Sequence, residues 1–446
     1  MTTQGHEGFI GDLERRTPHE PEYVQAVREV YESLWPFVER NPRYRRDGLL
    51  ERLVEADRVI QFRVTWVDDG GEVRVNRGFR VQHSMAIGPY KGGLRFHPSV
   101  NASVLKFLAF EQTFKNALTT LPMGGGKGGS DFDPKGKSDA EVMRFCQAFA
   151  VELFRHVGPY TDVPAGDIGV GGREIGYLVG MTKRLTNDAS AVFTGRGSSF
   201  GGSELRPEAT GYGLLYFLER MLGRRGDILD RMRVSVSGSG NVATYAIEKA
   251  MEMGGLVVTA SDSSGSVHDP EGFTSDKLAV LRRVKEKERG RIDAYAAEVG
   301  VEFRPGRTPW DVPVDVALPC ATENELDADD ARQLIANGVR YVAEGANMPT
   351  TRGAVTAFRD AGVVHAPGKA SNAGGVAVSG MEMSQAAQHA SWTAADVDRR
   401  LRSVMESIHD ACVHHAPERD RVDYFDGANI AGFVKVADAM IAQGVV

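Results

Sequence analysis

The 446-residue sequence is poor in several features that mark large classes of proteins. It has three cysteines, Cys146, Cys320 and Cys412, which lie far apart and form no CxxC pair. This predicts reduced structural thiols in a cytoplasmic protein, with no metal site. No apolar run reaches the roughly 18 residues of a membrane span, and the N-terminus lacks the apolar core of a secretory signal.

The sequence also lacks an excess of positive charge. It carries 53 Lys and Arg against 60 Asp and Glu, a net charge of −7, which does not favour a nucleic-acid or anionic-membrane partner. Its 42% apolar and 25% charged residues are typical of a globular protein. The length predicts two or three domains, each with a sizeable core.

Glycine, in contrast, is abundant, and five glycines flank Lys127 in the segment 122–131, PMGGGKGGSD. We expect a loop in which the backbone approaches a ligand closely and burial lowers the pKa of the lysine, as amine or carbonyl chemistry requires. The alternative is a surface turn with a solvated lysine. A phosphate-binding P-loop is disfavoured, because Gly128 stands where that motif has Ser or Thr.

The first 200 residues predict a mixture of helices and strands around two such glycine-rich loops. The second loop, 163–176, places Asp167 among glycines as Lys127 is placed. Gln112 and Lys115 stand three apart, so they project from one face of their helix. The predicted elements are helices at 21–56, 101–118 and 138–157 and an antiparallel hairpin of 61–67 with 73–81. The glycine-rich segment 195–202 suggests a domain boundary.

The second half contains the pattern of a dinucleotide-binding unit. A strand at 231–237 leads into the turn Gly238-Ser239-Gly240-Asn241-Val242-Ala243, a helix to Met253 and a second strand that ends at Asp262. A glycine-tolerant helix start is the alternative. Further expected elements are a basic helix across 285–291, strands at 314–320, 339–347 and 363–368, a glycine-rich loop at 372–379, and helices at 397–414 and 428–443. Their alternation predicts a doubly wound parallel sheet.

Taken together, four blocks resemble a hexameric glutamate dehydrogenase in order and spacing: 90–100, 122–134, 163–176 and the SGSGNVA turn. The tail 427–444 is similar to the bacterial NADP-dependent branch. The resemblance implies an α/β protein with a substrate-binding and oligomerisation domain (1–200, mixed sheet), to which a C-terminal helix (425–446) returns. It also implies a Rossmann domain (201–424), an active site in the cleft between the domains, and a homohexamer.

The implied reaction is the reversible reductive amination of 2-oxoglutarate with ammonium and NADPH to L-glutamate, in the direction of ammonium assimilation. Lys127 and Asp167 would be catalytic. Lys115 with Gln112 would bind the α-carboxylate, and Lys91 with Ser379 the distal one, near Gly92, Gly166 and Val376. Homologues acting on leucine or phenylalanine have an apolar residue at the Lys91 position.

The cofactor prediction rests on the resemblance rather than on the spacing rule. An acidic residue at Asp262 would favour NAD, because it accepts from a free ribose 2′-hydroxyl. The ASDSSG segment resembles the NADP-dependent branch instead, and basic side chains could surround a 2′-phosphate. The expected cofactor residues are Thr210, Gly238, Ser239, Gly240, Asn241, Val242, Asp262, Ser263, Ser264, Lys285, Arg291, Asn347 and Asn372.

Two other functions stay open at this point. One is a related dehydrogenase that acts on a branched-chain oxo acid. The other is a catalytically silent NADP sensor that binds a partner protein. The joint presence of Lys91, Lys115, Lys127 and Asp167 argues against the sensor, because a protein that does no catalysis does not need all four of these residues.

Overall fold

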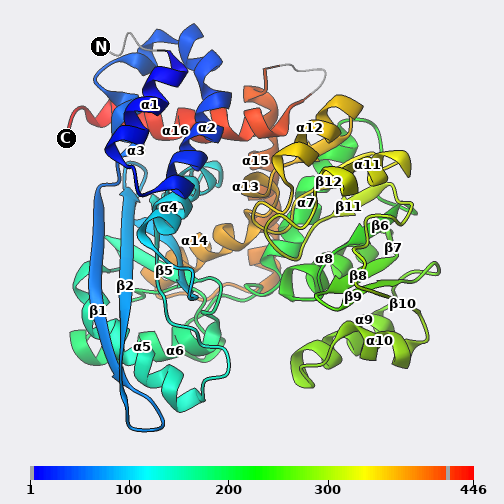
Figure 1. Ribbon diagram of the computed structural model, residues 1–446, viewed down its shortest axis with the longest axis horizontal. Coiled ribbons are helices and arrows are strands. Elements are labelled where there is room, and N and C mark those ends of the chain that lie inside the picture. Colours follow the sequence, from blue (N-terminus) through cyan, green and yellow to red (C-terminus); the bar gives the residue numbers. More distant parts are fainter. Residues whose placement is uncertain (1–4, 418–421) are drawn as a thin grey trace. The chain divides into compact units, whose positions relative to one another are not determined.

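The chain folds into two compact units in the computed structural model, which describes residues 5–417 and 422–446 (Figure 1). Unit 1 comprises Met1–Arg206, Val376–Val397 and Asn429–Val446, and unit 2 comprises Pro207–Gly375 and Asp398–Ala428. The expected division at residue 200 placed 376–397 in the second domain. That assignment is wrong, because this segment makes its contacts in unit 1.

Unit 1 is built on a mixed five-stranded sheet in the order β1-β2-β4-β3-β5. The predicted hairpin of β1 and β2 is confirmed, β4 pairs antiparallel with β2, and β3 pairs parallel with both β4 and β5. The strands are β1 (Arg58–Val67), β2 (Val73–Ser84), β3 (Tyr90–Phe96), β4 (Gly125–Ser130) and β5 (Asp162–Gly166).

The glycine-rich segment around Lys127 is therefore a strand, β4, and the loop prediction for it is wrong. The start of the second predicted loop is likewise a strand, β5, and Gly172 begins a helix. Packing explains the glycines of β4. A Cβ on Gly125 would lie 1.9 Å from Oγ1 of Thr113 on α4 (Ala102–Leu118), and Gly129 has a φ of 153°. The glycines let a helix pack directly on the strand that carries Lys127.

Helices enclose the cores of unit 1. The predicted caps of α4 and α5 (Asp139–Leu153) are confirmed, with Asn101 accepting from the Val104 amide and Ser138 forming a capping box with Glu141. With α6 (Gly172–Thr186), α5 packs on the sheet through a cluster that includes Phe96, Phe132, Phe145 and Phe149.

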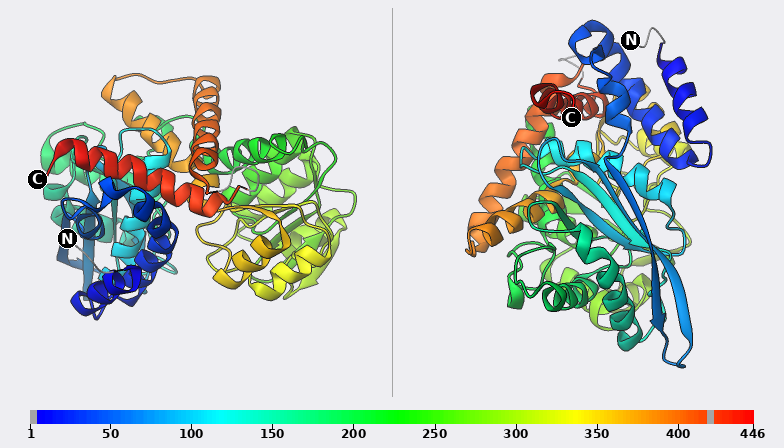
Figure 2. Two further views of the ribbon diagram at one scale, coloured as in Figure 1. Left: turned by 90° about the horizontal axis from the view of Figure 1, so that it is seen from above. Right: turned by 90° about the vertical axis from the view of Figure 1, so that its left-hand side faces the viewer.

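The expected helix at 21–56 is interrupted. It is α2 (Pro21–Arg40), a 3₁₀ turn (Pro42–Arg45) and α3 (Leu49–Val54), because Pro42 lacks the N–H that would continue α2. Together with α1 (His6–Arg16), these helices form a core with α16 (Tyr424–Gln443), which runs beside them in Figure 2. Phe433 of α16 contacts Phe37 and Tyr44 edge-on, which ties the end of the chain to its start.

Unit 2 contains a five-stranded parallel sheet in the order β13-β12-β11-β6-β7. Its strands are β6 (Arg233–Val236), β7 (Leu256–Val257), β11 (Val316–Leu318), β12 (Tyr341–Ala343) and β13 (Val364–Ala366), and its helices include α7 (Ala209–Gly223), α8 (Asn241–Glu252), α11 (Ala328–Ala336) and α12 (Arg352–Ala361). Burial of these short strands on both faces explains their continuous apolar runs, and the expected Rossmann-type architecture is confirmed.

Several predicted elements of the second half differ from the structure. The second strand is divided: β7 belongs to the parallel sheet, whereas β8 (Thr259–Asp262) forms an antiparallel sheet with β9 (Gly265–His268) and β10 (Glu302–Pro305). The basic helix is α9 (Ser275–Arg282) followed by a π-helical turn (Arg283–Lys287), and Arg291 precedes α10 (Ile292–Val299). The segment expected as a loop at 372–379 is mostly helical, with α14 (Gly374–Ala387) following α13 (Gly368–Ser371) and preceding α15 (Ala394–His415). Within 5–417 and 422–446, none of the helices has the length and apolarity to cross a membrane.

Candidate active site

Unit 1 brings together Lys127 of β4 and Asp167, which directly follows β5. Nζ of Lys127 lies 3.3 Å from Oδ2 of Asp167, and the two side chains are 6% and 13% exposed. Burial lowers the pKa of Lys127, although the charge of Asp167 opposes this. Burial favours the neutral form of Asp167, but the charges of Lys127 and Arg95 outweigh it and hold the pKa of the carboxyl below its usual range. A carboxylate and a readily deprotonated amine thus meet at one point.

Arg95 completes this group and was not among the predicted site residues. Its Nε donates to Oδ2 of Asp167 at 2.8 Å, and its side chain is 7% exposed. The signal for it was in the sequence, because Arg95 stands four residues after Lys91 on β3 and so shares its face of the strand.

Lys115 lies close enough to Lys127 for the two charges to interact. Burial and the charge of Lys127 together lower the pKa of Lys115 to about 8. Gln112 is fixed one turn earlier on α4, where its Nε2 donates to Oδ1 of Asn116 at 2.7 Å. Asn116 in turn donates to the backbone oxygen of Lys91 at 3.0 Å, so α4 and β3 are held together next to the lysines.

Lys91 is the most deeply buried of the three lysines, with 1% exposure. Burial, with the nearby charges of Arg80 and Arg206, lowers its pKa to about 7, while Glu382 and Asp162 act in the opposite direction. Arg80 is itself fully buried, and its Nε donates to Oδ2 of Asp162 at 2.8 Å. Neither Arg80 nor Asp162 was predicted, because no local motif surrounds them.

Arg206 is a half-buried cation of this cluster that sequence reasoning missed. Its charge lowers the pKa of both Lys91 and Lys115, and burial lowers its own. Its Nε is buried and has no hydrogen-bond partner among the described residues. A buried cationic donor without a partner is costly unless an anion completes it.

The remaining predicted substrate residues also lie in unit 1. Gly92 follows Lys91 on β3, where a Cβ would come within 1.7 Å of the Gly126 carbonyl oxygen, and Gly166 ends β5 beside Asp167. Val376 and Ser379 lie on α14, one half-buried and the other 2% exposed.

The predicted dinucleotide turn joins β6 to α8 in unit 2. Gly238 has a φ of 83°, which a side chain disfavours, and Gly240 is the N-cap of α8. Ser239 is buried, Val242 is half-buried, and Nδ2 of Asn241 donates to the Pro207 carbonyl at 2.6 Å. The first amides of α8, with the positive end of the helix dipole, form an anion-binding geometry.

Asp262 ends β8 with its carboxylate fully engaged. Oδ1 accepts from the amide and hydroxyl of Ser264 at 2.8 and 2.6 Å, and Oδ2 accepts from Lys285 Nζ at 2.7 Å and the Ile292 amide at 2.9 Å. Arg291 donates to the Ser263 hydroxyl. The expected residues Asp262, Ser263, Ser264, Lys285 and Arg291 therefore form one cluster.

Asn347 and Asn372 form a second cluster in unit 2. Nδ2 of Asn372 donates to Oδ1 of Asn347 at 3.0 Å and to the Ala346 carbonyl at 2.9 Å, while its own Oδ1 is buried without a hydrogen-bond partner in the described chain. Thr210 is half-buried in the first turn of α7.

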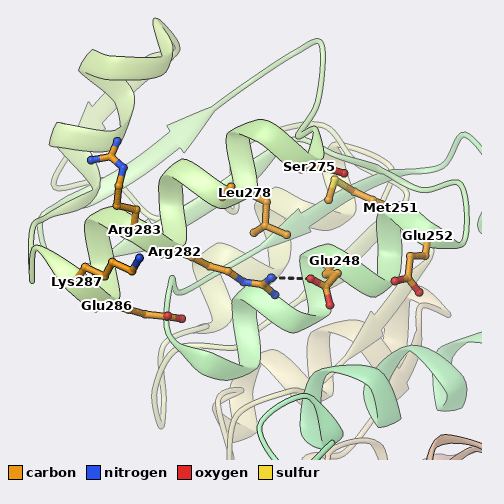
Figure 3. A pocket seen from close by; sticks show the side chains of 10 residues that line it. Glu248, Met251, Glu252, Ser275, Leu278, Arg282, Arg283, Glu286 and Lys287 are labelled. Carbon is orange, nitrogen blue, oxygen red and sulfur yellow. Dashed lines mark hydrogen bonds and ion pairs between the residues drawn. The ribbon is translucent and has the colours of Figure 1, made fainter. Parts of the chain in front are cut away.

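A separate groove of about 630 Å³ lies between α8 and α9 and contains none of the predicted site residues (Figure 3). Arg282 crosses it to donate to Oε2 of Glu248 at 2.6 Å. Acidic and basic side chains both line this groove, so its charge does not favour an anionic ligand.

Comparison with known proteins shows the family to which the chain belongs. The family model described as Glutamate/Leucine/Phenylalanine/Valine dehydrogenase matches residues 201–444, and the model for the Glu/Leu/Phe/Val dehydrogenase dimerisation domain matches 56–184. The chain belongs to the Glu/Leu/Phe/Val dehydrogenase family. The resemblance noted from the sequence motifs is thereby confirmed.

Among members of this family, the chain is 65% identical to the NADP-specific glutamate dehydrogenase of Escherichia coli (strain K12), over 100% of this chain and 99% of the relative. It is 55% identical to the NAD-specific glutamate dehydrogenase of Bacteroides fragilis, over 99% of both chains. A crystal structure of Plasmodium falciparum glutamate dehydrogenase superposes with a TM-score of 0.97 at 50% identity, covering 99% of this chain and 95% of that one.

Proposed function

We propose that this chain catalyses the reversible reductive amination of 2-oxoglutarate with ammonium and NADPH to L-glutamate, in the direction of ammonium assimilation. The observation that carries the proposal is the cluster of cations beside the Lys127–Asp167 pair: Lys91, which is buried, and Lys115 and Arg206, which are half-buried. Burying several like charges is unfavourable by itself, and a small dianion with a reactive carbonyl compensates it.

The cations divide the recognition of the diacid between them. Lys115, with Gln112 held on the same helix face, binds the α-carboxylate, and Lys91 with Ser379 binds the distal one. Arg206 lowers the pKa of both lysines, which suits a position from which it assists binding of the dianion. The residues Gly92, Gly166 and Val376 line the same site. A buried lysine at 91 favours an acidic side chain over the apolar ones of leucine or phenylalanine.

The Lys127–Asp167 pair performs the carbonyl chemistry. Lys127 donates a hydrogen bond to the carbonyl oxygen, and Asp167 accepts a proton from bound ammonium. The resulting ammonia forms a bond to the carbonyl carbon. The C=O π bond breaks, its electron pair moves to the oxygen, and Lys127 donates a proton to that oxygen to form a hydroxyl. The added nitrogen then gives a proton back to Lys127, and the proton held by Asp167 passes to the hydroxyl. Water leaves, the protonated imine remains, and both side chains regain their starting protonation states.

NADPH, when bound, supplies the hydride that reduces the imine carbon. The residues of unit 2 fit this cofactor. The turn Gly238-Ser239-Gly240-Asn241-Val242 presents amides to the pyrophosphate, and Asn347, Asn372 and Thr210 are proposed for the nicotinamide side. The buried, unpartnered Oδ1 of Asn372 supports such a role, since it leaves an acceptor for a ligand donor.

The preference for NADPH over NADH is argued from Asp262. Its four hydrogen bonds leave no strong acceptor for a ribose 2′-hydroxyl, and they hold Lys285 and Ser264 beside Arg291 and Ser263, as a 2′-phosphate requires. Lys285→Ala should therefore raise the KM for NADPH at least about tenfold and change that for NADH little. Lys287→Ala, an exposed lysine two residues away, is the control. Equal changes in KM for both cofactors, or equal turnover with NADH in the unmodified enzyme, would refute the proposed preference for NADPH.

The central test of the function is NADPH oxidation with 2-oxoglutarate and ammonium, each omitted in turn. Both must be required, and a branched-chain oxo acid must not replace 2-oxoglutarate. Lys127→Ala should abolish turnover and leave the affinity for NADPH nearly unchanged, whereas Lys137→Ala, at an exposed lysine, should leave turnover intact. Turnover that survives Lys127→Ala would contradict the mechanism.

We also infer a cytoplasmic homohexamer. The matched dimerisation domain covers the β1–β2 hairpin, which exposes Val59, Val67, Val73 and Val75, and an apolar strand surface of this kind favours contact with another chain. Light scattering that gives a monomer would remove this inference. The three cysteines are free and buried, as expected of a protein from a reducing compartment.

A further inference from the structure

Glu344 is a buried carboxylate in unit 2 that was not among the predicted site residues and that the proposed chemistry does not use. It is 3% exposed and directly follows β12. Its Oε2 accepts from the Gly368 amide at 2.6 Å, and its Oε1 lies 3.1 Å from Nε2 of His365 on β13. Its backbone oxygen accepts from the Ser371 hydroxyl at 2.6 Å. Glu344 therefore joins the segment that follows β12 to the segment that follows β13.

The two joined segments carry the asparagines that are proposed for the nicotinamide side of the cofactor. Asn347 stands three residues after Glu344, and Asn372 is the C-cap of α13. The backbone amide of Asn372 donates to the Gly368 carbonyl oxygen at 3.0 Å, so Gly368 links Glu344 to Asn372 through its own N–H and C=O groups. The side chain of Asn372 in turn donates from Nδ2 to Oδ1 of Asn347 at 3.0 Å. A continuous set of hydrogen bonds thus runs from the Glu344 carboxylate to both asparagines.

The two segments approach each other most closely at Gly368. A Cβ at this position would lie 2.6 Å from the Ala346 carbonyl oxygen and 3.2 Å from Nδ2 of Asn372. This approach buries the Gly368 amide, which as the first amide of α13 has no acceptor within its own helix. The carboxylate of Glu344 supplies the acceptor, and a charged acceptor makes a stronger bond than a neutral one.

We propose that Glu344 is a positioning residue for hydride transfer, which holds the segment of Asn372 against that of Asn347 and so fixes where the nicotinamide ring lies. This inference rests on the proposed function, because it takes both asparagines to face the nicotinamide. The pyrophosphate and the 2′-phosphate are assigned to the turn after β6 and to the cluster around Asp262. Loss of Glu344 should therefore disturb the placement of the ring far more than the affinity for the whole cofactor.

The test compares Glu344→Ala, which removes both side-chain acceptors, with Glu344→Gln, which keeps one oxygen for the Gly368 amide. Because a displacement of about 1 Å between reacting groups costs about a hundredfold in rate, kcat should fall about a hundredfold in Glu344→Ala and about tenfold in Glu344→Gln. The Kd of NADPH, measured by fluorescence titration, and the KM for 2-oxoglutarate should each change less than about threefold.

Amide hydrogen exchange of the NADPH-free protein gives a readout that does not depend on activity. Peptides that contain Gly368 and Asn372 should exchange about tenfold faster in Glu344→Ala than in the unmodified chain, because loss of a charged acceptor makes local opening easier. Asp315→Asn is the matched control, since Oδ2 of Asp315 accepts from the Arg233 amide at 2.9 Å at the amino-terminal end of the same sheet. It should leave kcat and the exchange of these peptides unchanged, even where it lowers the unfolding midpoint.

The outcomes separate this inference from the proposed function. If the unmodified enzyme does not aminate 2-oxoglutarate, the proposed function fails. If it does, the inference alone fails when Glu344→Ala keeps its kcat, when its affinity for NADPH falls as steeply as kcat, or when the exchange of the Gly368 and Asn372 peptides does not change. If Glu344→Ala does not fold, Glu344→Gln decides: a kcat about tenfold lower with NADPH affinity retained supports the inference, and an unchanged kcat overturns it.

Discussion

Replacement of Lys91 by methionine should make the protein more stable, and more so at low pH. The ammonium group is 1% exposed, and its pKa falls from 10.5 to about 7 on burial. Because the pKa is lower in the folded than in the unfolded chain, the unfolded chain holds more protons between these two values. The free energy of unfolding therefore rises with pH through that window.

The size of the effect follows from the same shift. Burial of Lys91 lowers the free energy of unfolding by about 5 kcal/mol at pH 6, where the side chain stays charged. At pH 8.5 the side chain loses its proton on folding and the cost is about 3 kcal/mol, at roughly 1.4 kcal/mol per pKa unit. Lys91→Met removes this cost and keeps a side chain of similar length. Its advantage in thermal unfolding midpoint should be largest at pH 6 and shrink by pH 8.5, while its KM for 2-oxoglutarate rises steeply.

Scanning fluorimetry at both pH values, without substrate, measures the difference, and Lys137→Met supplies the control at an exposed lysine. A midpoint advantage that is the same at pH 6 and pH 8.5, or a variant less stable than the parent at pH 6, would refute the reasoning that charge burial dominates at this position.

Three further results are expected. Arg95→Met removes a hydrogen bond and a positive charge from Asp167, so the pKa of Asp167 should rise and the acidic limb of the kcat/KM profile should move up by about one pH unit; an unmoved limb would contradict this. Arg80→Met leaves Asp162 buried without its partner and should cost about 3–5 kcal/mol in the free energy of unfolding, measured by denaturant titration, with part recovered on adding Asp162→Leu. Ser138→Ala removes one helix cap and should cost about 1 kcal/mol, without changing kcat.

The sequence predicted those features that depend on local chemistry. The capping box at Ser138, the hairpin of β1 and β2 and the turn around Gly238 follow from short-range rules, and all three are present. Glycine-rich segments were misassigned as loops, because the close approach of α4 to Gly125, which requires glycine within a strand, is a long-range contact.

The candidate site shows the same division. Gln112 and Lys115 were placed together by helix spacing alone. Arg206 was missed because it acts on Lys91 across more than a hundred residues of sequence, and nothing near it in sequence marks a ligand. Buried charges of this kind are recognisable from their missing partners only after folding has brought them together.

The saturated carboxylate of Asp262 bears on attempts to re-engineer the enzyme for the cheaper, unphosphorylated coenzyme. Asp262 holds both Lys285 and the Ile292 amide, so a substitution of this aspartate would release both groups. A variant intended to use NADH should keep Asp262 and replace Lys285 and Arg291 by neutral residues.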